Sequence, residues 1–286
     1  MNIWPDFEVK GIDNCDRHID YIHRQTETED IYFVSNSNQS EQQFTAVFRV
    51  EGNKVPEIWD AETGLVQRKV EYTKTENGIS MELVMDPIAS RFVVFKIKSA
   101  GKNDAGLKSD LQYGFHRAKK SSEPIDITDN WELGFNTEMG GPDTYRIDTL
   151  KSWSEVDDEG VKYYSGKATY TRDFMVEENA LKESEAYVVF DDIQEMARIS
   201  VNGNDCGIVW LPPYKANITQ WLNPGKNTIT VQVINTWNNR VVGDLTNPDK
   251  KQYTSTNVKT SKFKPNGPLL KSGLLGKAEI LILQKH

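Results

Sequence analysis

Hydrophobic and polar residues alternate in short runs along most of the chain, with the period of two that indicates strands. Between residues 30 and 98, six such runs are rich in β-branched and aromatic residues and are separated by turn sequences such as Glu51-Gly52-Asn53. We expect strands at Ile31–Val34, Phe44–Val50, Glu57–Trp59, Lys69–Thr73, Ile79–Met85 and Phe92–Ile97. Six strands at this spacing predict an antiparallel β-sandwich over residues 29–98.

The same alternation returns after residue 124 and predicts a second all-β domain over residues 124–286. Its clearest signal is Asn202-Gly203, a two-residue hairpin turn between the expected strands Ile199–Val201 and Gly207–Trp210. Pro212-Pro213 is expected to form an extended connector after that hairpin. Further strands are expected at Ile125–Ile127, Trp131–Phe135, Thr169–Val176, Ala186–Phe190, Thr228–Ile234 and Ala278–Leu283.

Three segments lack this alternation. Residues 99–123 are rich in Gly, Ser, Lys and Asn, which predicts an interdomain linker. Residues 1–28 are polar, and the spacing of Ile19 and Ile22 allows one short helix there. Residues 245–264 form a long polar loop in this interpretation.

Composition narrows the classes of partner. The 286 residues are long enough for two domains, and 37% hydrophobic with 27% charged residues is typical of a folded soluble protein. A formal net charge of −8 argues against nucleic acid or an anionic membrane as partner, because both require a clustered positive face. No apolar run predicts membrane insertion, and the first residues lack a signal-peptide pattern. The chain is therefore either cytoplasmic or a piece whose export signal lies elsewhere.

The cysteines and acidic runs give weaker signals. Cys15 and Cys206 make no metal motif, and we expect two thiols that are buried or without a functional role. A disulfide bond between them is the alternative. The acidic run Glu155 to Gly160 is interpreted as a solvated turn, with a calcium loop as the alternative.

The candidate binding site lies in the second domain. Sugars present hydroxyl groups and C–H surfaces, so their sites combine aromatic faces with amide, carboxylate and guanidinium groups. That set of residue types occurs together at expected strand ends and loops: Trp210, Tyr214, Asn235, Trp237, Asn239, Arg240 and Asp244. The alternative is structural, with both tryptophans in packing contacts and Arg240 and Asp244 as an internal ion pair.

The order of motifs in Ile199–Asp244 resembles the sugar-binding jelly-roll domain of family 2 glycoside hydrolases. Two further stretches, Asn235-Thr236-Trp237-Asn238-Asn239-Arg240 to Gly243-Asp244 and Ser272-Gly273-Leu274-Leu275-Gly276, are similar to the C-terminal domain of α-L-rhamnosidases of glycoside hydrolase family 106. The resemblance extends to Tyr164–Tyr170 and, more loosely, to Asp30–Asn36.

This resemblance implies an all-β chain, a β-sandwich followed by a galactose-binding-like jelly roll, in a parent enzyme that hydrolyses terminal α-L-rhamnosides outside the cytoplasm, in the periplasm or the extracellular space. Residues 1–28 would be the tail of its catalytic barrel, with His23 and Arg24 near a sugar or in a surface pair. The family's catalytic glutamates lie on the barrel, and no position here matches them, so no catalytic residue is assigned and the chain alone is expected to be inactive. A structural calcium ion is a further implication, with Asp191 and Asp192 as its candidates.

Three hypotheses follow. The first is an accessory region that packs on the catalytic barrel and contacts a rhamnose-containing glycan; the second is an independent carbohydrate-binding module; the third is a structural or interaction module. An exposed apolar face on the first sandwich favours the first, because a missing barrel leaves an interface uncovered. An exposed Trp237 in a concave patch favours the second. Burial of both tryptophans favours the third.

Overall fold

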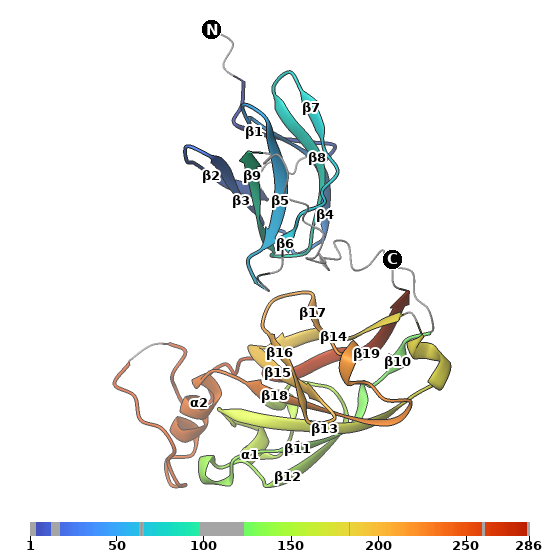
Figure 1. Ribbon diagram of the computed structural model, residues 1–286. Helices are drawn as coiled ribbons and strands as arrows, with labels where there is room; N and C mark the ends of the chain where they lie inside the picture. Colours follow the sequence, from blue (N-terminus) through green and yellow to red (C-terminus); the bar gives the residue numbers. More distant parts are fainter. Residues whose placement is uncertain are drawn as a thin grey trace. The chain divides into compact units, whose positions relative to one another are not determined.

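The chain forms two units, Met1–Arg117 and Ala118–His286, each built from antiparallel sheets (Figure 1). The computed structural model describes residues 4–12, 18–62, 64, 66–97, 123–182, 184–258 and 261–284. Within those ranges the α-helices are α1 (Glu159–Lys162) and α2 (Asn238–Thr246), and none of the described helices is long and apolar enough to cross a membrane. The predicted all-β fold class is confirmed.

The first unit is a sandwich of a four-stranded sheet, in the order β1-β4-β8-β7, and a five-stranded sheet, in the order β2-β3-β9-β5-β6. Its core is formed by the inward-facing residues of both sheets, among them Tyr32, Phe48 and Phe95, whose rings contact one another. The strands are β1 (Phe7–Lys10), β2 (Ile19–Gln25), β3 (Glu29–Asn36), β4 (Gln42–Phe48), β5 (Lys54–Asp60), β6 (Val66–Gln67), β7 (Thr73–Thr75), β8 (Gly78–Met85) and β9 (Ser90–Ile97).

The short helix expected near Ile19 and Ile22 is wrong, because this segment is strand β2, paired with β3. Ile19 and Ile22 are three residues apart, as on one face of a helix. In the strand, the side chains that contact the interior are Ile19, Tyr21 and His23, at period two. Strand β1 likewise pairs with β4. Both strands of the expected N-terminal tail, residues 1–28, therefore belong to the sheets of the first unit.

The expected strand at Lys69–Thr73 is also wrong. Residues 68–72 connect β6, at the edge of the five-stranded sheet, to β7, at the edge of the four-stranded sheet. A segment that passes from one sheet to the other cannot pair along its length with either. The expected linker at 99–123 lies outside the described residues except for its last position.

The second unit pairs a four-stranded sheet, in the order β10-β19-β14-β17, with a six-stranded sheet, in the order β12-β11-β13-β18-β15-β16, which is the expected jelly-roll type of sandwich. One large core of inward-facing aliphatic and aromatic side chains fills the space between them. The strands are β10 (Ile125–Asp126), β11 (Asp129–Gly134), β12 (Thr144–Thr149), β13 (Lys167–Val176), β14 (Ser184–Gln194), β15 (Met196–Val201), β16 (Asn204–Val209), β17 (Tyr214–Asn217), β18 (Gly225–Ile234) and β19 (Gly273–Gln284). Single 3-10 turns are η3 (Thr137–Met139), η4 (Trp153–Glu155), η5 (Glu178–Leu181) and η6 (Thr219–Trp221).

The Asn202-Gly203 hairpin is confirmed. Val201 pairs with Asn204, and both turn residues have positive φ, 50° and 80°, as a two-residue turn of this kind requires. The side-chain amide of Asn202 also donates to the carbonyl of Trp221 at 2.8 Å. The Pro212–Pro213 peptide bond is cis.

Part of the expected loop after β18 is instead the nine-residue helix α2. Trp237 occupies its N-cap position and makes no side-chain capping bond, so the usual start signal is absent from the sequence. The buried residues of α2 include the polar Asn239, Arg240 and Asp244, which a search for an apolar stripe does not detect.

Candidate functional site

The seven residues predicted to bind sugar occupy four neighbouring parts of the second unit. Trp210 directly follows β16, Tyr214 begins β17, Asn235 and Trp237 lie between β18 and α2, and Asn239, Arg240 and Asp244 belong to α2. Their environments divide them into two amides bonded inside the unit, a buried ion pair, a partly buried tyrosine and two exposed tryptophans.

The side chain of Asn235 connects three segments inside the second unit by hydrogen bonds. Its amide oxygen accepts a hydrogen bond from the backbone N–H of Gly166 at 2.8 Å, and its amide nitrogen donates to the carbonyl of Tyr164 and to Oγ of Ser272, both at 3.0 Å. These bonds tie the end of β18 to the segment before β13 and to the entry of β19. The amide is thereby occupied inside the unit.

Asn239 performs a similar task in the first turn of α2. It is 1% exposed, donates to the carbonyl of Leu270 at 2.8 Å and to Oγ of Ser272 at 3.1 Å, and accepts from the N–H of Leu270 at 2.8 Å. The helix is therefore fastened to the segment that leads into β19. A sugar contact of Asn235 or Asn239 stays a prediction.

Arg240 and Asp244 form a buried pair one turn apart on α2, with Nε and Oδ1 3.1 Å apart. The Nε–H is not directed at that oxygen as in a hydrogen bond, so the contact is Coulombic. The other carboxylate oxygen, Oδ2, accepts from the N–H groups of Tyr253 and Thr254, at 2.9 and 2.6 Å, and from Oγ1 of Thr254 at 2.7 Å. Asp244 thus holds the following loop against the helix.

A pocket of about 140 Å³ lies beside this pair. The guanidinium carbon of Arg240 is 4.9 Å from the ring centre of Tyr253, and Nζ of Lys251 is 4.8 Å from the same ring. Lys250 and Glu159, also in the lining, form an ion pair with each other. The residue set is therefore one aromatic ring, three cations and two carboxylates, counting Asp244.

Two glycines allow this packing. A Cβ atom at Gly140 would lie 2.6 Å from the ring of Tyr253. At Gly243 it would lie 2.6 Å from Cβ of Tyr163 and 2.8 Å from a terminal nitrogen of Arg240. Sequence reasoning identified Arg240 and Asp244 but missed Tyr253 and Lys251, because they lie in a polar loop that carries no pattern.

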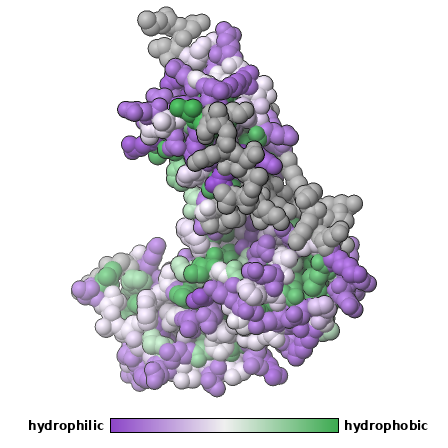
Figure 2. Space-filling view, viewed as in Figure 1, coloured by the Kyte–Doolittle hydropathy of each residue, from purple (hydrophilic) through white to green (hydrophobic). Residues whose placement is uncertain are grey.

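Five exposed apolar side chains form a second feature, which we call the apolar rim: Met196, Ile208, Trp210, Ile234 and Trp237. Trp210 is 51% exposed and Trp237 is 53% exposed. Met196 pairs with Ile234, and the neighbouring Ala197 pairs with Val209, so the ends of β18, β15 and β16 lie at one level of the six-stranded sheet. On the face drawn in Figure 2, hydrophobic side chains of the second unit reach the surface among hydrophilic ones.

Tyr214 is partly buried and packs against the core. Burial, with the nearby charges of Asp192 and Glu195, raises the pKa of its hydroxyl group. Its ring therefore serves packing, while the hydroxyl group is held in its neutral form.

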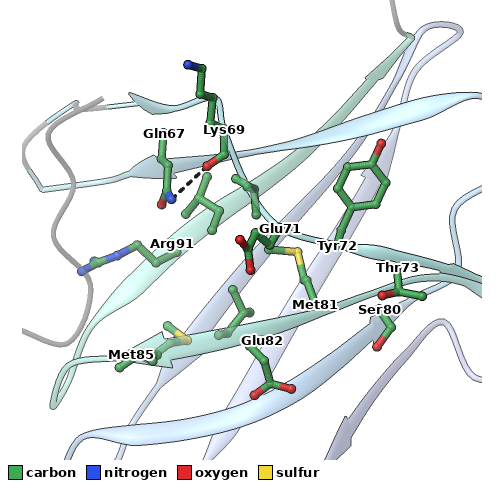
Figure 3. A pocket seen from close by; sticks show the side chains of 14 residues that line it. Gln67, Lys69, Glu71, Tyr72, Thr73, Ser80, Met81, Glu82, Met85 and Arg91 are labelled. Atoms are coloured by element: carbon green, nitrogen blue, oxygen red, sulfur yellow. Dashed lines mark hydrogen bonds between the residues drawn. The ribbon is translucent and has the colours of Figure 1, made fainter. Parts of the chain in front are cut away.

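The first unit contains a larger cavity, of about 730 Å³, between β8 and the connection from β6 to β7 (Figure 3). The apolar part of its lining includes Met81 and Met85, and Gln67 donates to the carbonyl of Lys69 at 3.2 Å. Arg91 also lines the cavity and is 7% exposed. Its guanidinium group pairs with two buried carboxylates, those of Asp60 at 3.3 Å and Asp86 at 3.6 Å. Lys69, Glu71, Thr73 and Glu82, which also line it, are exposed, so the cavity is open to solvent.

His23 is engaged inside the first unit. Its Nδ1 lies 3.0 Å from the carboxylate oxygens of Asp6, its Nε2 lies 3.3 Å from Asp30, and its ring stacks on Tyr32 at 3.9 Å. Asp30 also contacts Nζ of Lys54 at 2.6 Å. Burial, and the charges of Asp6 and Asp30, raise the pKa of the Tyr32 hydroxyl group.

The acidic candidates for calcium have structural partners. Asp158 caps α1 through the N–H of Val161 at 3.0 Å, Asp191 accepts from the N–H of Lys277 at 2.7 Å, and Asp192 accepts from the side chain of Gln194. Within the described ranges no three His, Cys, Asp or Glu side chains gather as a metal site would need. Cys206 is a free thiol whose pKa is raised by burial, while Cys15 lies outside the described residues.

Two family models match this chain. Residues 1–74 match a model described as α-L-rhamnosidase of glycoside hydrolase family 106, and residues 153–263 match one described as a glycosyl hydrolase 2 galactose-binding domain-like region. The second match contains the pocket residues Glu159, Arg240 and Tyr253 and the whole of the apolar rim. The expected resemblance to both families is confirmed, and the chain is a region related to glycoside hydrolases.

Known proteins extend this likeness. A solved rhamnosidase from Novosphingobium sp. PP1Y is 28% identical with a TM-score of 0.80, over 98% of this chain and 25% of that one. A curated protein named putative beta-glucuronidase, from Formosa agariphila, is 29% identical over 187 residues, which is 58% of this chain and 16% of that protein. The chain thus spans about a quarter of the matched rhamnosidase and about a sixth of the curated relative.

Proposed function

We propose that this chain is the non-catalytic accessory region of an α-L-rhamnosidase, and that it contributes sugar contacts beside a catalytic domain. The observation that carries the proposal is the likeness to the Novosphingobium rhamnosidase, which covers 98% of this chain with a TM-score of 0.80. Because that likeness covers only a quarter of the rhamnosidase, most of an enzyme of this kind lies outside the matched region.

The non-catalytic part of the proposal follows from what glycoside hydrolysis requires. Two carboxylates must flank the scissile bond, on a scaffold that shapes a pocket around the sugar. In the pocket beside α2, the two carboxylates are those of Asp244 and Glu159, and each is paired with a cation. Both carboxylates are therefore engaged in ion pairs within the chain.

An apolar outer face on the first unit supports packing against a further domain. Ile22 pairs with Phe33, Phe33 with Phe92, and Phe92 with Trp59, which makes a row across four strands of the five-stranded sheet. Phe33 alternates with the buried Tyr32, so this row lies on the face away from the core. Ile22 is 59% exposed, and an apolar row on an outer sheet face is typical of an interface.

Sugar contact is assigned to the apolar rim. Exposed indole rings offer flat apolar faces, to which the C–H faces of a pyranose ring bind. Trp210 and Trp237 are both about half exposed, which also disfavours a purely structural role for them. The same exposure favours the second candidate function, an independent carbohydrate-binding module. We also propose that the parent enzyme is exported to the periplasm or out of the cell.

Hydrolysis assays test the accessory role. The purified chain is incubated with 4-nitrophenyl α-L-rhamnoside and with rhamnose-terminated oligosaccharides, and released product is measured against a buffer blank and against a known rhamnosidase. The proposal predicts no release above the blank. Turnover by this chain, retained after repeated purification, would contradict the non-catalytic role.

A further inference from the structure

Arg240 is a buried cation with unused hydrogen-bond donors. The residue is 7% exposed, yet none of its guanidinium N–H groups donates a hydrogen bond to a described residue. Burial of such a group without partners is costly, and the stacking on Tyr253 and the Coulombic contact with Asp244 satisfy its charge but not its N–H groups.

The unused donors face the pocket beside α2. Nε is fully enclosed and has no hydrogen-bond partner. The two terminal nitrogens are not fully enclosed, and Arg240 lines the pocket. A planar pair of N–H groups at the end of a guanidinium group matches the two oxygens of a carboxylate. The geometry therefore favours a planar anion over a hydroxyl group.

The charges around the pocket support an anion. Asp244 is neutralised by Arg240 and by its three hydrogen bonds, and Glu159 by Lys250. Among the described residues of this pocket, Lys251 is then the cation without a carboxylate partner, since its described contact is the ring of Tyr253. The Tyr253 ring adds an aromatic surface next to both cations.

We propose that the pocket formed by Arg240, Lys251 and Tyr253 binds the carboxylate of a uronic acid residue in the glycan. Arg240 receives the carboxylate, Lys251 adds a second positive charge, and Tyr253 lies beside the sugar ring. This inference rests on the proposed function, since it names an acidic sugar as part of the same glycan, but its site is separate from the apolar rim.

The test is an NMR titration of the full chain with methyl β-D-glucuronide and, as the matched neutral ligand, methyl β-D-glucoside, which differs only in having CH₂OH in place of the carboxylate. We expect saturable shifts at the backbone amides of Gly243 and Tyr253 with the glucuronide, and about tenfold weaker binding of the glucoside. Equal binding of both ligands, or no shift at these amides, would overturn the proposal. Equal shifts with sodium acetate would reduce the site to one for simple anions and would overturn the assignment to a sugar acid.

Variants locate the site. Lys251→Ala is at the surface and is expected to weaken glucuronide binding about threefold, while Arg240→Lys is expected to abolish it because a single ammonium cannot replace the planar pair. Lys226→Ala, at the opposite end of β18, is the matched control and should leave binding unchanged. Arg240 is buried, so Arg240→Lys could unfold the chain; in that case Lys251→Ala decides the test. Unchanged glucuronide binding by Lys251→Ala would count against the proposal.

In the same spectra, the indole N–H of Trp237 reports binding of rhamnose oligosaccharides. Failure of this inference is therefore distinguished from failure of the proposed function.

Discussion

The indole nitrogen of Trp153 donates to the hydroxyl oxygen of Tyr170 at 2.5 Å, deep in the core of the second unit. The backbone N–H of Leu274 donates to the same oxygen at 3.2 Å. Between these partners runs Gly273, with φ of 95°, where a Cβ atom would lie 2.5 Å from both the Trp153 nitrogen and the Tyr170 oxygen. Close packing at the start of β19 thus explains the glycine at position 273 of the Ser272–Gly276 motif.

Gly273→Ala is therefore expected to destabilise the second unit by at least about 2 kcal/mol, from overpacking added to backbone strain. Gly203→Ala is the matched control, since Gly203 also has positive φ but has no atom within 4 Å of a Cβ position. That control should cost only about 1 kcal/mol. Urea unfolding of both variants measures the difference, and equal losses would show that the contact with Trp153 and Tyr170 is unimportant.

Tyr170 predicts a loss of stability at alkaline pH. Burial raises the pKa of its hydroxyl group, so the folded state keeps the proton after the unfolded state has released it. Its contribution to stability is fully present below the unfolded pKa of about 10 and falls as the pH rises above that value. The free energy of unfolding of Tyr170→Phe should therefore decline less steeply between about pH 9 and 11 than that of the unchanged chain. Parallel curves of unfolding free energy against pH for the two proteins would contradict this assignment. At pH 7 the variant should lose about 1–3 kcal/mol of unfolding free energy, because the N–H groups of Trp153 and Leu274 lose their acceptor.

Much of the fold could be predicted from the sequence, because strands with one buried face leave a period of two and Asn202-Gly203 leaves a turn signal. Strand β2 was missed because Ile19 and Ile22, three residues apart, fit one face of a helix, whereas in the strand Ile22 is exposed. Helix α2 was missed because its buried positions include Asn239 and Arg240 and its N-cap is Trp237. Local pattern cannot show polar burial of this kind, since it depends on partners distant in sequence, such as Ser272.

The candidate site was predictable only in part. Residue types that bind sugars identified Arg240, Trp210 and Trp237, but the same amide chemistry also selected Asn235, whose hydrogen bonds lie inside the unit. Tyr253 joins the pocket because Asp244 binds its backbone N–H, a contact that no spacing rule predicts.

The Arg198–Asp205 pair on the β15–β16 hairpin predicts an acid titration. Two hydrogen bonds from Arg198, at 3.0 and 2.8 Å, lower the pKa of Asp205 to about 2. The stability that this pair contributes is present above the unfolded pKa and is lost as the pH falls through about 2. NMR titration of the Asp205 carboxyl group should give a midpoint near that value, and Arg198→Ala should raise it toward an ordinary aspartate pKa. An unchanged midpoint in the variant would contradict the role of Arg198.

Asp244 is predicted to hold the loop after α2. Asp244→Ala removes the acceptor of three hydrogen bonds and leaves Arg240 buried without its carboxylate, at an expected cost of about 3 kcal/mol. Hydrogen exchange at the amides of Tyr253 and Thr254 should become much faster. Asp249→Ala, on an exposed residue of the same loop, should change neither quantity. Equal protection in both variants would contradict this role.

The central claim is that the apolar rim contacts sugar without catalysing its hydrolysis, and calorimetric titration tests it most directly. The chain, Trp237→Ala, and Trp4→Ala as a control of similar exposure in the first unit are titrated with rhamnose-terminated oligosaccharides. The account predicts saturable binding by the chain and by Trp4→Ala, and binding by Trp237→Ala that is at least about tenfold weaker. Equal binding by all three proteins, or no heat at millimolar sugar from the unchanged chain, would contradict it.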